Sequence, residues 1–249
     1  MTITGGNITT GAMGIGVEIG GNTTFSGGTI NAKNGISNSG SLEVTGGEIL
    51  TTNYGISSSG TMQMSDGTVE ANGYDGIRNT GEAYITGGNI SASGDDYNGV
   101  YNYSGGTLTI SGNPNISNDA SSTYAVYNYS NSGDTNKSTM TITDGTISST
   151  NNDYAVGNMY GTLDISGNIE IDGVYNAHGT ANISGYAIIY SVDNDCGTTN
   201  IKGNAQIIGD GKEAISSNGA LNISGANKYG IVNISENATI MREDGDITG

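Results

Sequence analysis

Short apolar pieces separated by turn-forming residues repeat along the whole chain. Residues 41–60 show one unit: Val44 ends an alternating apolar piece, Ile49 opens a second, and Ile56 lies in a third. Each piece is bounded by glycine, serine or asparagine and is too short for a helix, so each is predicted to be a strand of roughly three to five residues. The unit begins again at Thr61, and a repeat of about twenty residues indicates a solenoid.

The aliphatic positions of this unit can be followed in register almost to the C-terminus. The aliphatic residue before the first turn recurs as Ile3, Phe25, Val44, Met64, Ile85, Ile110, Ile142, Ile165, Ile183, Ile201, Ile223 and Ile234. The third-piece aliphatic recurs as Ile15, Ile36, Ile56, Ile77, Val100, Val126, Val156, Val174 and Ile215. Three short strands per repeat, all in one direction, predict an all-β fold: a parallel β-helix of about eleven coils that occupies residues 1–249 as one domain.

Two kinds of turn separate the first and second strands. Gly46-Gly47 leaves five residues from Val44 to Ile49, and glycine allows the positive φ that such a turn needs. In the C-terminal half the spacing is six residues, as from Ile110 to Ile116, and the extra residue is expected to form a bulge or a wider corner.

A polar position follows the third-strand aliphatic two residues later. Stacked coils would place these side chains above one another about 4.8 Å apart, where amides can form a hydrogen-bonded ladder. An isolated buried asparagine would cost free energy, whereas a stacked one is satisfied by its neighbour. The predicted ladder comprises Asn38, Asn79, Asn102, Asn128, Asn158 and Asn176, with Ser58 and Ser217 at equivalent positions.

Outward positions of the third strand carry an unusual group of aromatic residues. Tyr101, Tyr127 and Tyr175 stand where the regular coils have serine, and Tyr103, Tyr129 and Tyr160 lie near them at the following turn. Stacked outward tyrosines make a flat apolar strip edged with hydroxyls, which suits sugar rings and predicts a carbohydrate-binding face. The alternative is that aromatic residues simply fit strands and cover long loops.

Composition and charge exclude several classes of protein. The chain has 43 glycines and one proline in 249 residues, which argues against helices, and it lacks the roughly 18 consecutive apolar residues of a membrane helix. The formal charge is −17, so nucleic acid and anionic membranes are not expected partners. Cys196 is alone, which excludes an internal disulfide. No signal peptide is visible at Met1, so such a segment is absent or already removed, or the chain is a fragment.

Acidic loops in the middle coils suggest a calcium site. Ca²⁺ takes six to eight oxygen ligands, and Asp95, Asp96, Asp119 and Asp153 lie in the insertions of these coils. No EF-hand spacing and no glycine-rich nonapeptide array occurs, so solvated charge is the competing interpretation.

Catalytic residues are sparse. A glycosidase needs paired carboxylates on one face, but Asp95 and Asp96 are adjacent and would point to opposite faces of a strand. His178 is the single histidine and lies in a turn, and Arg78 has no acidic cluster near it in sequence. These observations favour a non-enzymatic protein; a polysaccharide lyase or glycoside hydrolase of the β-helix type is the alternative.

The repeats Ile85–Ile90 and Tyr54–Gly60 resemble the right-handed, single-stranded β-helix repeats of surface proteins from Gram-positive bacteria, and more broadly the pectate-lyase-like superfamily. The resemblance covers residues 1–240 and implies an extracellular or cell-surface spacer or adhesin that contacts glycans or a host surface. It also leaves open that the chain is a segment of a longer surface protein. Open strand edges at the ends of a solenoid leave a third hypothesis, end-to-end stacking into a filament.

Overall fold

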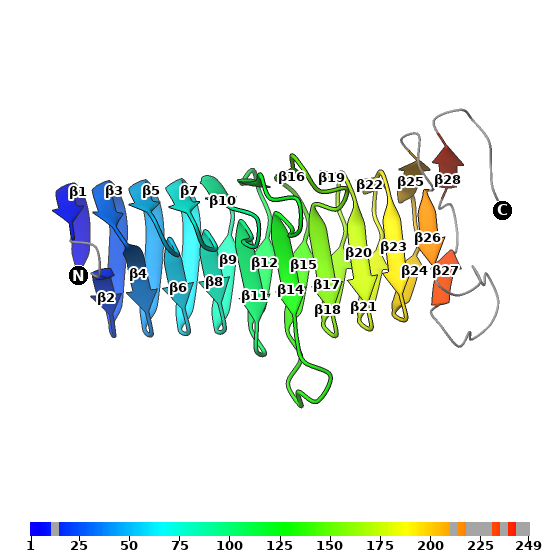
Figure 1. Ribbon diagram of the computed structural model, residues 1–249, viewed down its shortest axis with the longest axis horizontal. Helices are drawn as coiled ribbons and strands as arrows, with labels where there is room; N and C mark the ends of the chain where they lie inside the picture. Colours follow the sequence, from blue (N-terminus) through cyan, green and yellow to red (C-terminus); the bar gives the residue numbers. More distant parts are fainter. Residues whose placement is uncertain (11–14, 210–213, 218–230, 235–238, 243–249) are drawn as a thin grey trace.

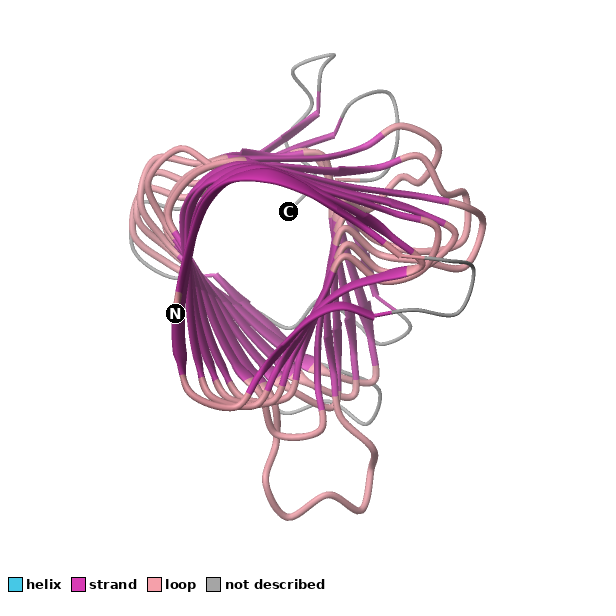
Figure 2. Cartoon of the chain, turned by 90° about the vertical axis from the view of Figure 1, so that its left-hand side faces the viewer, coloured by secondary structure: helices cyan, strands magenta, loops and turns pink. Residues whose placement is uncertain are grey.

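The computed structural model describes residues 1–10, 15–209, 214–217, 231–234 and 239–242, and every regular element in these ranges is a β-strand (Figure 1). Successive coils lie side by side along one axis, from β1 at one end to β28 near the other. Viewed down the axis, the strands follow the outline of one coil and the loops project from its corners (Figure 2). The predicted all-β parallel solenoid is confirmed.

The strands form two parallel sheets, of eighteen and ten strands. The larger sheet contains β1 (Thr2–Thr9), β3 (Asn22–Ala32), β5 (Ser41–Thr51), β7 (Thr61–Asn72), β9 (Glu82–Ile85), β10 (Asn89–Ser93), β12 (Thr107–Ile110), β13 (Asn115–Asn118), β15 (Thr139–Ile142), β16 (Thr146–Ser149), β18 (Thr162–Ile165), β19 (Glu170–Ile171), β21 (Thr180–Ile183), β22 (Ile188–Ile189), β24 (Thr198–Ile201), β25 (Gln206–Gly209), β27 (Ile231–Ile234) and β28 (Thr239–Arg242). The smaller sheet contains β2 (Ile15–Ile19), β4 (Asn34–Asn38), β6 (Ile56–Ser58), β8 (Ile77–Asn79), β11 (Val100–Tyr103), β14 (Val126–Tyr129), β17 (Val156–Met159), β20 (Val174–Ala177), β23 (Val192–Asp195) and β26 (Ile215–Ser217).

Each coil pairs with the next in the predicted register. Val44 lies opposite Met64, and Ile56 lies opposite Ile77. The smaller sheet has ten strands, one per coil in the described residues, against about eleven coils predicted. Residues about twenty apart therefore lie directly over one another, as the repeat requires.

The first coils differ from the prediction of separate first and second strands. β3, β5 and β7 each run through the Gly-Gly or Asp-Gly turn as one strand of 11 or 12 residues, with a register shift at the turn. A bulge bends the strand without ending it. Gly47 has φ +88°, and a Cβ there would lie 2.7 Å from the Phe25 ring, so glycine is required at this bend. In later coils the strand does break, both in five-residue units, as between β9 and β10, and in six-residue units, as between β12 and β13.

Two described positions differ from the predicted register. Val17, not Ile15, pairs with Ile36 in the smaller sheet. Val192 in β23 occupies a third-strand position that the sequence pattern did not reveal. Ile201 pairs with Ile234, and the predicted position Ile223 lies outside the described residues.

The core is one continuous column inside the coils. Ile36, Ile56, Ile77 and Val100 are fully buried in successive coils of the smaller sheet, and aliphatic residues of the larger sheet pack against them. Full burial of each such side chain contributes about 1.5–3 kcal/mol, so the stability of the solenoid grows with the number of stacked coils. Among the described residues there is no helix of the length and apolarity needed to cross a membrane.

Candidate functional site: the tyrosine surface

The smaller sheet divides its side chains between the core and the solvent. Along β11, Val100 and Asn102 are buried, whereas Tyr101 and Tyr103 are half-buried on the outer face. β14 repeats this arrangement, and Tyr101 lies opposite Tyr127 in the pairing of the two strands. The inward asparagine column therefore lies directly behind the outward tyrosine column.

The buried asparagines form a continuous chain of side-chain hydrogen bonds. Each Nδ2 donates to the Oδ1 of the asparagine in the next coil, for the pairs Asn79–Asn102 (2.7 Å), Asn102–Asn128 (2.8 Å), Asn128–Asn158 (2.8 Å), Asn158–Asn176 (2.7 Å) and Asn176–Asn194 (2.9 Å). Asn38 donates instead to the hydroxyl of Ser58, at 2.9 Å. All of these asparagines are at most 2% exposed.

The same amides also tie the third strand to the following turn. Asn102 Nδ2 donates to the Gly106 carbonyl at 2.9 Å and to the Thr139 carbonyl of the next coil at 3.0 Å. Each amide thus connects two coils and one turn in a buried setting, where an unmade hydrogen bond is costly. The ladder holds the backbone that carries the outward tyrosines in a fixed position.

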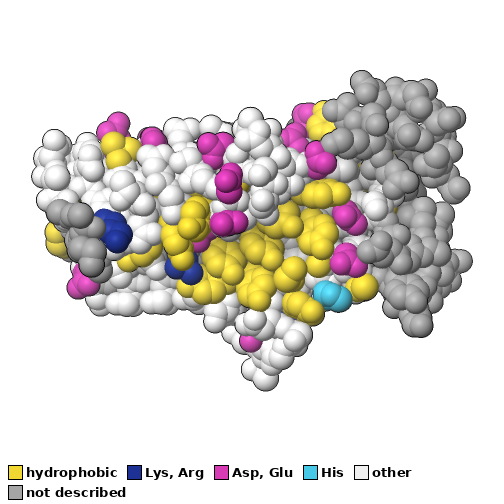
Figure 3. Space-filling view, viewed as in Figure 1, with side chains coloured by type: hydrophobic (Ala, Val, Ile, Leu, Met, Phe, Trp, Pro, Cys, Tyr) yellow, Lys and Arg dark blue, Asp and Glu magenta, His cyan; other side chains and the backbone are white. Residues whose placement is uncertain are grey.

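The outward rings and the tyrosines of the neighbouring turns form a group that we name the tyrosine surface. Seven of its rings contact one another, and the Arg78 guanidinium joins them to the stacked pair Tyr74–Tyr97. Its members are Tyr74, Tyr97, Tyr101, Tyr103, Tyr124, Tyr127, Tyr129, Tyr154 and Tyr175. The centroid distances are 4.5 Å for Tyr74–Tyr97, 4.6 Å for Tyr101–Tyr103, 5.6 Å for Tyr101–Tyr127, 6.2 Å for Tyr101–Tyr129, 4.9 Å for Tyr124–Tyr127, 5.8 Å for Tyr127–Tyr129, 6.1 Å for Tyr124–Tyr175 and 5.9 Å for Tyr154–Tyr175. Figure 3 shows the resulting continuous apolar area over the middle of this face, with acidic side chains along its border.

Tyr124 closes a gap in the outward column. Gly157 pairs with Tyr127 on one side and with Tyr175 on the other, so this coil offers no ring of its own. The Tyr124 ring lies over Gly157, where an added Cβ would come within 2.6 Å of it. Tyr124 contacts both Tyr127 and Tyr175 and so makes the surface continuous across this coil.

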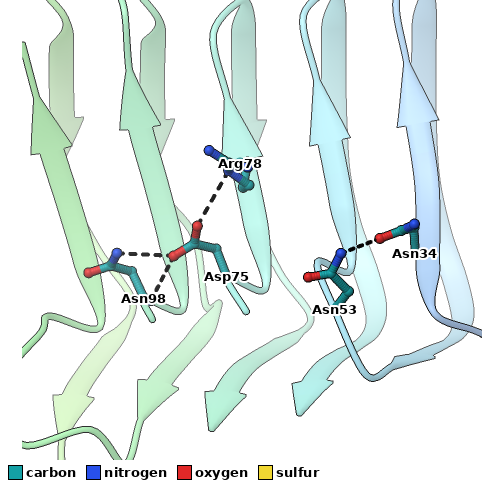
Figure 4. A network of polar contacts seen from close by, with 5 residues as sticks. All are labelled: Asn34, Asn53, Asp75, Arg78 and Asn98. Atoms are coloured by element: carbon teal, nitrogen blue, oxygen red, sulfur yellow. Dashed lines mark hydrogen bonds and ion pairs between the residues drawn. The ribbon is translucent and has the colours of Figure 1, made fainter. Parts of the chain in front are cut away.

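An Arg78 guanidinium lies at the N-terminal end of the surface, between the rings of Tyr74 (5.4 Å to the centroid) and Tyr103 (5.1 Å). Its Nε is 3.4 Å from Asp75 Oδ2. Asp75 Oδ1 accepts hydrogen bonds from the backbone N–H (2.8 Å) and Nδ2 (3.0 Å) of Asn98 (Figure 4). Burial raises the pKa of Asp75, and the Asn98 hydrogen bonds and Arg78 oppose that rise.

A shallow pocket of about 250 Å³ opens beside this cluster. Its lining includes the rings of Tyr97, Tyr101 and Tyr127 together with Arg78 and Asp96. Aromatic walls with a few polar groups are typical of small-molecule binding sites.

The C-terminal end of the surface is acidic. Tyr175 pairs with Asp193 of β23, and the Tyr154 hydroxyl donates to Asp193 Oδ2 at 3.4 Å. Burial raises the pKa of Asp193, and the Tyr154 hydrogen bond opposes this. Burial also raises the pKa of Tyr101 and Tyr154 to about 12, so the ring hydroxyls are neutral donors at ordinary pH.

The loop between β14 and β15 projects beyond the coil beside this face (Figure 1). The Tyr129 hydroxyl donates to Asn131 Oδ1 of this loop at 2.8 Å. The Tyr160 ring stacks on His178 at 4.8 Å, not on a described tyrosine, and Lys137 lies 5.5 Å from its centroid. Of the six tyrosines predicted to bind carbohydrate, the structure thus brings five into one connected group.

The acidic residues considered for calcium are spread over different loops. Asp96 lines the pocket beside Tyr97, whereas Asp119 lines a separate pocket and accepts a hydrogen bond from the Gly94 N–H at 3.3 Å. Within the part of the chain that the structure describes, no three His, Cys, Asp or Glu side chains are grouped closely enough to hold a metal ion. The calcium site stays a prediction without a clustered set of ligands.

Sequence reasoning missed four tyrosines of the surface and one asparagine of the ladder. Tyr74, Tyr97, Tyr124 and Tyr154 all precede a third strand by two or three residues, and this recurrence was a usable signal. Asn194 was missed together with its strand, because Val192 is preceded by Ser191 instead of the glycine or alanine found in the other coils.

Comparison of the chain with protein-family models, with curated proteins and with solved structures finds no match.

Proposed function

We propose that this chain is a non-enzymatic module, displayed outside the cell or on its surface, that binds glycans through the tyrosine surface. The observation that carries the proposal is the connected group of partly exposed rings from Tyr101 to Tyr175, which Arg78 joins to the Tyr74–Tyr97 pair. Aromatic rings pack against the apolar faces of sugars, and their hydroxyls and the neighbouring polar side chains supply hydrogen bonds.

Rigidity of the support favours binding. The outward rings are on strands whose inward asparagines are joined across coils by buried hydrogen bonds of 2.7–2.9 Å. A preorganised surface loses little conformational entropy when a ligand binds, so even weak contacts to several sugar units can add up to useful affinity.

The surface chemistry fits a glycan better than a protein partner. Among the described residues, the exposed large hydrophobic side chains are Met1, Tyr84 and Tyr186, none of which belongs to the tyrosine surface, so its rings present only part of their faces. The surroundings of the rings are asparagine, serine, threonine and aspartate, which suit hydroxyl-rich ligands.

The cell-surface location rests on resemblance. The repeats resemble those of Gram-positive surface proteins and of the pectate-lyase-like superfamily, in which exported spacers, adhesins and carbohydrate-active enzymes occur. The net charge of −17 favours neither nucleic acid nor an anionic membrane as a partner. A glycan or a glycan-bearing host surface is the partner that we infer.

A glycan array read in parallel with lyase and hydrolase assays tests the proposal. We expect retention of glycans without turnover, and we expect Tyr101→Ala, Tyr127→Ala and Tyr175→Ala each to weaken retention about tenfold while the circular dichroism spectrum is unchanged. Tyr186→Ala is the matched control, because Tyr186 is 65% exposed and lies outside the tyrosine surface. Unchanged retention in all three variants would refute the site, and turnover of a glycan would instead favour the enzyme.

A further inference from the structure

The pocket beside Arg78 contains two polar groups whose hydrogen-bonding capacity is not used by any residue that the structure describes. The Asp75 carboxylate is 4% exposed and is engaged by Asn98 and Arg78. Thr123 donates to the Tyr97 carbonyl at 2.8 Å. By contrast, Arg78 Nε is buried without a hydrogen-bond partner, and neither the rest of the Arg78 guanidinium nor the Asp96 carboxylate forms a hydrogen bond to a residue that the structure describes.

These two groups are complementary in hydrogen bonding. A guanidinium only donates and a carboxylate only accepts. Two adjacent hydroxyls of a sugar ring can satisfy both, one accepting from Arg78 and the other donating to Asp96, while the ring packs against the aromatic wall of Tyr97, Tyr101 and Tyr127.

The charges of the pocket disfavour an ionic ligand. Its lining holds one cation, Arg78, and two carboxylates, Asp75 and Asp96, within a chain of net charge −17. A ligand carboxylate would be repelled by this excess of negative charge. A ligand cation would have to compete with Arg78, which already lies between the rings of Tyr74 and Tyr103.

We infer that this pocket binds one neutral sugar unit through a pair of adjacent hydroxyls held by Arg78 and Asp96, and that the tyrosine surface therefore selects neutral over acidic glycans. The inference rests on the proposed function and adds the class of glycan. The rest of the oligosaccharide then extends over the rings of Tyr124 and Tyr175.

The probes are neutral oligosaccharides of glucose, galactose and xylose, and, for the two hexoses, counterparts in which the primary hydroxyl is oxidised to a carboxylate. Binding is measured by isothermal titration calorimetry on the whole chain. We expect a neutral probe to bind at least about tenfold more tightly than its oxidised counterpart at about 20 mM salt, with the difference shrinking at about 300 mM salt. Equal or tighter binding of the acidic probe would overturn the inference and leave the proposed function standing. Absence of binding to every probe, neutral and acidic, would overturn both.

Variants then test the two polar groups. Asp96→Ala and Arg78→Gln should each lower affinity for the neutral probe about tenfold, because each removes a hydrogen bond to a charged group. Asp95→Ala is the matched control: it changes the charge equally at the neighbouring exposed residue, which does not line the pocket, and it should leave affinity within about twofold. Asp96 is exposed, so its variant should fold even if Arg78→Gln does not. Full affinity of Asp96→Ala would overturn the inference.

Discussion

Replacement of Asn128 by alanine is the most informative perturbation of the asparagine ladder. Asn128 is fully buried, and its Nδ2 donates to Asn158 Oδ1 (2.8 Å) and to the carbonyls of Ser138 (3.2 Å) and Thr162 (3.1 Å). Its Oδ1 accepts from Asn102 Nδ2 at 2.8 Å. The substitution removes all four hydrogen bonds and breaks the ladder in its middle.

The expected loss follows from the partners that remain. Asn102 keeps its bonds to Gly106 and Thr139, and the Ser138 carbonyl still accepts from the Thr162 N–H at 3.0 Å. Asn158 Oδ1 is left without its amide donor in a buried site, which costs about 1–3 kcal/mol, and each further lost bond adds about 1 kcal/mol. We therefore expect Asn128→Ala to lower the free energy of unfolding by about 4–6 kcal/mol.

Asn182 provides a matched control from an outward position. It also joins coils through side-chain hydrogen bonds, to Asp164 Oδ1 (2.7 Å) and from Asn200 Nδ2 (2.8 Å), but it is partly exposed. Water can replace these partners, so Asn182→Ala should cost less than about 0.5 kcal/mol.

Urea unfolding followed by circular dichroism measures both variants, with the free energy taken from the midpoint and slope of each transition. A difference between them of less than about 0.5 kcal/mol would refute the reasoning, because the buried and exposed amides would then contribute equally.

Further predictions concern the rings, the ends and the loops. Gly157→Ala should displace the Tyr124 ring, since the alanine Cβ would lie 2.6 Å from that ring. We expect weaker glycan retention with an unchanged circular dichroism spectrum. Undiminished retention would show that glycan binding does not need a continuous row of rings. Burial raises the pKa of Tyr101 and Tyr154 from 10.0 to about 12. The stability that their neutral forms contribute should therefore be complete below pH 10 and lost as the pH rises toward about 12. Urea unfolding across that pH range measures this loss, and a constant free energy of unfolding would contradict the prediction. Among the described strands β1 pairs with β3 alone, so its other edge is open for end-to-end stacking. Light scattering at high concentration tests this: a mass that rises with concentration would support the filament, and a constant monomer mass would reject it. A chelator should leave glycan retention unchanged, and a loss restored by Ca²⁺ would instead support the calcium hypothesis.

The coil register was predictable because burial imposes it at every repeat. Ile56 and Ile77 are fully buried opposite one another, and a shift by one residue would turn both outward. The pattern failed in β2: Ile15 and Val17 are two residues apart in the sequence, so hydrophobicity alone does not show which of them pairs with Ile36.

The outward tyrosine column was predictable, but its continuity was not. Tyr101 and Tyr127 follow from strand alternation. Tyr124 lies in a turn, where no periodicity determines the direction of a side chain, and its position depends on the space above Gly157 in the next coil. The same limit applies to the pocket, which requires Arg78 of one coil, Asp96 of the following loop and Tyr127 of a later strand to come together.

The central claim is that glycans bind on the tyrosine surface, and nuclear magnetic resonance of tyrosine rings during titration with a retained oligosaccharide tests it most directly. The account predicts shifts in the ring signals of Tyr101, Tyr124, Tyr127 and Tyr175, with Tyr84 and Tyr186 unchanged as internal controls on other parts of the surface. Shifts confined to Tyr84 or Tyr186, or ring signals of the tyrosine surface that do not move at saturation, would contradict it.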